Sequence, residues 1–200
     1  RKQNVFKALE LGAVDFIAKP TRHISPELGS IRGEMLEKVL MVRQLQTSSL
    51  RARVSERQAA QDKADSLPPA LVALPEIGLV VVGASTGGPP ALQTIFQGLP
   101  RGLPLAFLVA QHMPENFTRA FADRLNRYTG LKVREAEGGE IIEGGEVLIA
   151  PGGKNLHVRQ HGGQLITEVT PGASDAKYVP SIDELFSSAA AAMGRRVMAI

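Results

Sequence analysis

Apolar residues recur with helical and with strand-like spacing along the chain, and a polar stretch separates a short N-terminal part from a longer C-terminal part. Residues 5–12 have the spacing of a helix, and 14–18 form a short apolar run that predicts a strand. A second helix is expected from about 25 to 46, with an apolar stripe that contains Ile31, Met35, Leu36, Val39 and Leu45. From about 47 to 77, charged and polar residues dominate and prolines interrupt the pattern, which predicts an interdomain linker.

From residue 78 onward, short apolar runs alternate with helical spacing. The runs at 79–82 and 105–110 are continuous, as expected of strands that are buried on both faces of a sheet. The first run is followed by a glycine-rich turn at 83–88 and by a helix that opens with two prolines. A helix that Gly130 ends follows the second run. This order of strands and helices predicts a mostly parallel sheet with helices on both faces.

The last third of the chain is expected to add strands, a β-hairpin and a helix. Strands are predicted at 131–133 and 147–149, and a hairpin is predicted from 155–159 and 164–170. The final helix begins with the capping box Ser181-x-x-Glu184 and stops at Gly194, before an apolar run at 197–200 that predicts a buried strand. The fold class is therefore α/β, a mostly parallel sheet with helices on both faces plus a β-hairpin.

Composition narrows the possible functions. The 200 residues contain no cysteine, which excludes disulfide scaffolds, thiol nucleophiles and cysteine-based zinc sites. The net charge is only +3, and basic residues are not interleaved with aromatics as in a nucleic-acid-binding face. The apolar runs are too short to span a membrane and no leader opens the chain, so we expect a cytoplasmic location.

The turn after the first strand matches a nucleophile elbow. Gly83-Ala84-Ser85-Thr86-Gly87 has the pattern G-x-S-x-G, and its predicted context is strand, turn and helix. Such a turn lifts the serine hydroxyl above the carboxyl edge of the sheet. It also places the next backbone N–H groups, at Thr86 and Gly87, at a helix N-terminus, where they can stabilise an oxyanion. The alternative is a glycine-rich turn that binds phosphate or has no chemical role.

A histidine follows the second strand at the same edge of the sheet. Parallel strands lie about 4.8 Å apart, so the side chains of His112 and Ser85 could meet there. Imidazole is the usual base that activates a serine near neutral pH. The alternative for His112 is a structural histidine that is hydrogen-bonded to a loop carbonyl.

No other histidine has a comparable position. His23 lies in a loop, His157 on the predicted hairpin and His161 in its turn, where solvent-facing structural roles are expected. Neither a histidine pair nor a histidine–carboxylate cluster has the spacing of a metal site. No phosphate-binding fingerprint occurs either, so we expect no metal and no cofactor.

These segments resemble those of a known family, the chemotaxis protein-glutamate methylesterases. The segment Val81 to Pro89 is similar to the active-serine segment of that family, and Gln111-His112-Met113-Pro114 is similar to its catalytic-histidine segment. Ala150-Pro151-Gly152-Gly153 and the segment Pro180 to Phe186 resemble two further motifs in the same order. The resemblance covers 78–200, and four ordered motifs are far more specific than a lone G-x-S-x-G.

The N-terminal part is similar to the end of a flavodoxin-like receiver domain. Ala8 to Phe16 and Ala18-Lys19-Pro20 carry this resemblance, which implies that Lys19 senses a phosphoryl group and that its bond to proline is cis. By resemblance, residues 1–46 are the C-terminal remnant of the receiver, 47–77 are the linker, and 78–200 are a methylesterase catalytic domain that is incomplete at its C-terminus.

Two family residues are expected outside this sequence. The phosphoacceptor aspartate would precede residue 1, and the catalytic aspartate, in a Gly-Met-Gly-x-Asp-Gly motif, would follow Ile200. We therefore expect a fragment truncated at both ends and nearly inactive alone. Asp175 and Asp183 precede the expected site and do not replace that aspartate. Asn155 stands where relatives often have histidine and Val179 where a basic residue is common, so both are expected to tune substrate contact.

The resemblance implies that the intact protein hydrolyses glutamate methyl esters, and deamidates glutamines, on chemoreceptors through a serine–histidine–aspartate mechanism. Ser85 would be the nucleophile and His112 the general base, with Thr86 and Gly87 at the oxyanion. The implied partners are the cytoplasmic domains of methylated chemoreceptors and a phosphodonor histidine kinase, without nucleic acid or membrane insertion. Two alternatives stay open: a nucleotide-binding module that cradles phosphate at 83–88, and a response-regulator output domain that only binds a partner.

Overall fold

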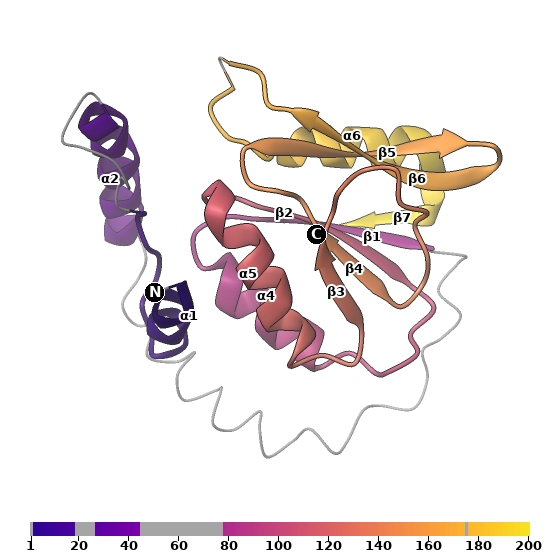
Figure 1. Ribbon diagram of the computed structural model, residues 1–200, viewed down its shortest axis with the longest axis horizontal. Helices are drawn as coiled ribbons and strands as arrows, with labels where there is room; N and C mark the ends of the chain where they lie inside the picture. Colours follow the sequence, from indigo (N-terminus) through magenta and orange to yellow (C-terminus); the bar gives the residue numbers. More distant parts are fainter. Residues whose placement is uncertain (1, 19–26, 45–77, 175) are drawn as a thin grey trace. The chain divides into compact units, whose positions relative to one another are not determined.

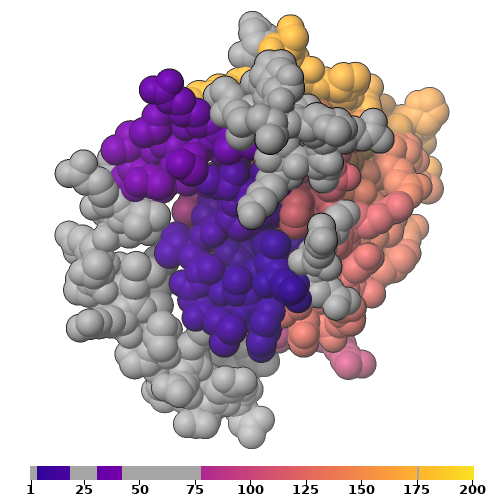
Figure 2. Space-filling view, turned by 60° about the vertical axis from the view of Figure 1, so that its left-hand side comes forward, coloured from indigo at the N-terminus to yellow at the C-terminus, as the bar shows by residue number. Residues whose placement is uncertain are grey.

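The computed structural model describes residues 2–18, 27–44, 78–174 and 176–200. The chain divides into two compact units, Arg1–Gly12 together with Ala73–Ile200, and Ala13–Val72. Helix α1 (Lys2–Glu10) belongs to the first unit and helix α2 (Glu27–Gln44) to the second. Both helices are indigo to purple in Figures 1 and 2, and the linker expected at 47–77 lies outside the described residues.

The centre of the first unit is a sheet of five parallel strands in the order β3-β4-β2-β1-β7 (Figure 1). The strands are β1 (Leu79–Ala84), β2 (Ala106–Gln111), β3 (Lys132–Glu135), β4 (Glu146–Ile149) and β7 (Val197–Ala199). Strands β5 (Lys154–His161) and β6 (Gln164–Pro171) form a separate antiparallel hairpin. The parallel sheet and the hairpin that the sequence predicts are both confirmed.

The two faces of the sheet are covered by different elements because successive side chains of a strand point to opposite sides. On one face, the apolar core of the sheet packs against β5 and helix α6 (Ile182–Met193), through Leu156 and Leu185. Helices α4 (Gly88–Gln97) and α5 (Glu115–Asn126) cover the other face, where Phe96 meets Phe107 edge to face at 5.4 Å. A short 3₁₀ helix, Gly194–Arg196, connects α6 to β7.

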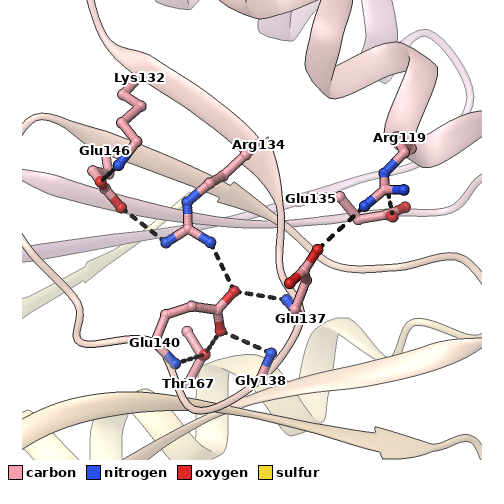
Figure 3. A network of polar contacts seen from close by, with 9 residues as sticks. All are labelled: Arg119, Lys132, Arg134, Glu135, Glu137, Gly138, Glu140, Glu146 and Thr167. Atoms are coloured by element: carbon pink, nitrogen blue, oxygen red, sulfur yellow. Dashed lines mark hydrogen bonds and ion pairs between the residues drawn. The ribbon is translucent and has the colours of Figure 1, made fainter.

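A network of charged side chains ties the edge of the sheet to the hairpin (Figure 3). Arg134 on β3 pairs with Glu140 at 2.9 Å and with Glu146 at 3.2 Å. Glu140 in turn accepts a hydrogen bond from Thr167 of β6. These contacts fix the connection between β3 and β4 over the hairpin, so the hairpin is held by polar contacts as well as by apolar packing.

Helix α1 packs on α5 within the first unit. The rings of Phe6 and Phe121 stack with their centroids 5.9 Å apart, and Glu10 forms an ion pair with Arg124. Phe6 is buried in this contact. The spacing that predicted a helix at 5–12 is thus explained by one apolar face turned toward α5.

Some expectations fail in the N-terminal part. Residues 14–18 do not form a strand, because a strand requires a hydrogen-bonded neighbour and none pairs with them among the described residues. In α2, Met35 and Val39 are exposed rather than buried in an apolar stripe. Lys38 of this helix contacts the carbonyl of Phe16 at 2.6 Å and the carboxylate of Asp15 at 3.2 Å. In the described ranges, no helix is long and apolar enough to cross a membrane.

Candidate active site

The site lies where β1 and β2 end side by side. The two strands are parallel and in register, with Ala84 opposite Gln111, and the backbone N–H of His112 donates to the carbonyl of Ala84 at 2.9 Å. Ser85 and His112 therefore follow paired positions at the carboxyl edge of the sheet. Their side chains meet, with 3.2 Å between Ser85 Oγ and His112 Nδ1.

The imidazole of His112 is half-buried, and its two nitrogens have different surroundings. Nδ1 faces the Ser85 hydroxyl, whereas the buried Nε2 makes no hydrogen bond of good geometry among the described residues, although the backbone of Pro180 approaches the ring. Burial lowers the pKa of His112 below its ordinary value, and the backbone of Pro180 acts in the opposite direction. The neutral imidazole that burial favours is the form that can accept a proton.

The turn after β1 has a backbone that requires glycine. Gly87 caps the N-terminus of α4 with a φ of 78°, and the N–H of Gly88 donates to the Ser85 carbonyl at 2.8 Å. Thr86 and Gly87 are half-buried beside the serine. The serine hydroxyl thus stands at the positive end of a helix, where a negatively charged oxygen is stabilised.

Gln111 joins the two candidate residues, a role that sequence analysis missed. Its side chain is 1% exposed, and its Nε2 donates to the backbone carbonyls of both Ser85 and His112 at 3.0 Å. A β-carbon at Gly88 would lie 2.0 Å from Gln111 Oε1, so the amide also needs glycine at that position. The available signal was a polar residue at the end of a continuous apolar strand.

The N-terminus of α6 also approaches the turn. A β-carbon at Gly83 would lie 2.4 Å from Ile182 Cγ2, so this glycine permits close contact with the helix. Ser181 caps the helix and accepts a hydrogen bond from Glu184 N–H at 3.2 Å. The predicted capping box is half formed, because the Ser181 N–H donates to the side chain of Asn155 instead of to Glu184.

Asn155, Val179 and His157 have defined contacts in the fold. Asn155 is 2% exposed and its amide also donates to Glu184 at 2.9 Å, so it joins β5 to α6 where substrate contact was expected. Val179 packs over Gly172. His157 is buried and contacts Thr170 Oγ1 at 2.9 Å, which corrects the expected solvent-facing position.

The remaining predicted residues are either exposed or undescribed. His161 is exposed at the hairpin end, and Lys19 and His23 lie outside the described residues. No group of three or more histidine or carboxylate side chains that could hold a metal ion occurs in the described ranges.

Comparison with known proteins places this site in a family. The family model described as CheB methylesterase matches residues 80–200, which include both Ser85 and His112. The chain belongs to the CheB methylesterase family. A solved structure with the same architecture is the CheB methylesterase catalytic domain of Thermotoga maritima. It is 35% identical with a TM-score of 0.59, and the match covers 61% of this chain and 65% of that one.

Curated relatives of this CheB-family chain have a common name. One protein-glutamate methylesterase/protein-glutamine glutaminase, from Anaeromyxobacter dehalogenans, is 47% identical over 100% of this chain and 54% of its own length. Another, from Geobacter sulfurreducens, is 40% identical over 99% of this chain and 57% of its own length. The chain therefore spans a little over half the length of these relatives.

Proposed function

We propose that Ser85 and His112 are the nucleophile and general base of a protein-glutamate methylesterase and protein-glutamine glutaminase. The observation that carries this proposal is the 3.2 Å separation between Ser85 Oγ and His112 Nδ1 at the carboxyl edge of the sheet. A hydroxyl within hydrogen-bond reach of an imidazole is the arrangement that activates a serine. The names of the relatives supply the substrate class.

The geometry suggests the following steps for a glutamate methyl ester. Ser85 Oγ attacks the side-chain carbonyl carbon while His112 Nδ1 takes the hydroxyl proton. Backbone N–H groups at Thr86 and Gly87, beside the N-terminus of α4, stabilise the negative oxygen of the tetrahedral intermediate. The bond to the methoxy oxygen then breaks, and Nδ1 returns the proton so that methanol leaves. Water hydrolyses the acyl-serine, and a glutamine side chain would release ammonia by the same route.

The second imidazole nitrogen points to a further partner in the intact protein. If Nδ1 accepts the serine proton, Nε2 carries the ring's own proton, and this buried donor has no acceptor at good hydrogen-bond geometry among the described residues, beyond the approach of the Pro180 backbone to the ring. A carboxylate at that place would orient the ring and stabilise the imidazolium. Strand β7 is parallel to β1, with Ala199 opposite Val81, so residues that follow Ile200 would emerge at the edge that carries Ser85. This direction supports the expected aspartate beyond Ile200.

Regulation by a receiver domain is the second part of the proposal. Residues 1–46 would be the receiver remnant, 47–77 the linker and 78–200 the catalytic domain, with Lys19 as the switch lysine and a histidine kinase as phosphodonor. The contact of α1 with α5, through Phe6 and Phe121, supports a receiver that touches the catalytic part. The partners would be the cytoplasmic domains of methylated chemoreceptors, which places the protein's action in the cytoplasm.

Replacement of the serine tests the catalytic assignment. In the intact protein, Ser85→Ala is expected to abolish methanol release from methylated receptors, because the variant lacks the hydroxyl that attacks the ester carbonyl. Ser187→Ala, which alters an exposed serine of α6, is the control and should keep normal activity. Methanol release at the normal rate from Ser85→Ala would show that the assignment is wrong.

Two further measurements separate the proposal from its alternatives. Deletion of residues 1–77 and anything before them should raise the basal hydrolysis rate, and an unchanged or lower rate would contradict inhibition by the receiver. A serine-directed phosphonate should label Ser85 and stop hydrolysis. Thermal stabilisation by nucleotides without any labelling would instead favour a phosphate-binding module.

A further inference from the structure

The ring of Tyr178 lies flat against the imidazole of His112. Their centroids are 4.8 Å apart and their planes differ by 13°. Tyr178 precedes α6, whereas His112 follows β2, so the stack joins two distant parts of the chain at the site. Stacked aromatic rings at this separation attract each other beyond the effect of buried area alone.

The backbone that carries Tyr178 is anchored on its C-terminal side. Val179 packs over Gly172, where a β-carbon would lie 2.5 Å from Val179 Cγ2. Pro180 is buried, and the Ser181 N–H donates to Asn155 Oδ1 at 2.8 Å. The tyrosine is 44% exposed, but its attachment to the fold is fixed within three residues.

The imidazole needs such a contact because few hydrogen bonds hold it. Nδ1 faces Ser85 Oγ, Nε2 makes no hydrogen bond of good geometry in the part of the chain that the structure describes, and the backbone of Pro180 also approaches the ring. A ring held by so few polar contacts can still turn about its Cβ–Cγ bond. A flat surface 4.8 Å away permits sliding but opposes that rotation.

We propose that Tyr178 is a positioning residue for the general base: its ring fixes the plane of the His112 imidazole so that Nδ1 stays directed at Ser85. This inference rests on the proposed esterase function. Because small misplacements of a reacting group cost large factors in rate, a residue that restricts the imidazole raises the rate without touching substrate. The ring face makes the contact, so the role belongs to the aromatic ring and not to the phenolic hydroxyl.

The variants Tyr178→Phe and Tyr178→Ala in the intact protein test this role. Phenylalanine keeps the stacking ring, so kcat should stay within about twofold of the normal value. Alanine removes it, and kcat should fall by about three- to tenfold with KM nearly unchanged. Tyr128→Ala is the matched control, because Tyr128 is 46% exposed and follows the C-terminal end of α5, whereas His112 precedes the N-terminal end of that helix. It should leave kcat unchanged.

A second measurement does not depend on catalysis. In NMR spectra, the ring protons of His112 should carry a ring-current shift from Tyr178 that Tyr178→Phe retains and Tyr178→Ala removes. If the shift is present but the wild-type protein hydrolyses no ester, the proposed function fails while the contact stands.

Several results would overturn the inference even with the esterase function intact. Normal kcat for Tyr178→Ala would show that the stack does not position the base. A rise in KM alone would make Tyr178 a substrate contact, and equal losses for the phenylalanine and alanine variants would assign the effect to the hydroxyl.

Discussion

Glu140 provides a quantitative test of how the hairpin is held to the sheet. Its carboxylate is 14% exposed and lies at the centre of the network in Figure 3. Burial by itself would raise its pKa. Hydrogen bonds from the N–H groups of Glu137 and Gly138, from the Thr167 hydroxyl and from its own backbone outweigh that effect and lower the pKa of Glu140 to about 2.

The size of the effect follows from this pKa. Lowering it from 4.5 to about 2 corresponds to about 3 kcal/mol of preference for the charged form in the folded state. Glu140→Gln keeps the shape, but it removes the charge and replaces one acceptor oxygen by an NH2 group that is itself a donor and faces the N–H and O–H donors around Glu140. We therefore expect the free energy of unfolding to fall by about 2–3 kcal/mol at pH 7.

The difference in the free energy of unfolding between wild type and Glu140→Gln should also depend on pH, and it should become smaller as the pH falls. The folded-state pKa lies below that of the unfolded chain, so the stabilisation is complete above pH 4.5 and disappears as the pH falls toward 2. Urea unfolding of both proteins at several pH values measures it. Glu137→Gln is the control, because Glu137 is 74% exposed and pairs with Arg119 at the surface, and it should change stability by less than about 0.5 kcal/mol. Equal unfolding midpoints for Glu140→Gln and wild type at pH 7 would refute the reasoning.

Three other predictions concern the site. Gln111→Met removes the donor that the carbonyls of Ser85 and His112 share, so the free energy of unfolding in urea should fall by about 1–3 kcal/mol. The kcat of ester hydrolysis should fall by about tenfold or more. An unchanged kcat would show that Gln111 does not hold the two residues in place. Gly83→Ala places a β-carbon 2.4 Å from Ile182 Cγ2 and should lower the free energy of unfolding by about 1–3 kcal/mol. The loss should be smaller in an Ile182→Ala background, and a double-mutant cycle without coupling would exclude this contact. In the 200-residue chain, NMR titration should give His112 a pKa below 6.5 because burial disfavours the imidazolium, and a higher value would contradict the described environment.

Much of the fold could be read from apolar spacing. The parallel strands β1 and β2 are apolar throughout because both of their faces are covered, and the turn glycines and prolines mark where helices begin. Residues 14–18 show the limit of that reading. Their composition suits a strand, but strand formation requires a neighbour that local sequence does not reveal.

The candidate site could be predicted from the sequence only in part. Ser85 stood out through its turn, and His112 through its place after a buried strand. Gln111 offered only its polar character at the end of an apolar strand, and Tyr178 offered no signal, because the contacts of both depend on which backbone carbonyls and which ring lie next to them. His157 was misjudged for the same reason, since its burial follows from packing between β5 and α6.

Sequence alone determined the order of elements in residues 78–200, the glycine-rich turn and the two residues proposed for chemistry, because these depend on local periodicity and on side-chain type. Tertiary structure decided the register that pairs Ala84 with Gln111, the 3.2 Å approach of the Ser85 hydroxyl to the His112 imidazole, and the ring that stacks on that imidazole. These features arise from contacts between residues distant in the chain. Their geometry is set by packing of the whole unit, and no local pattern encodes it.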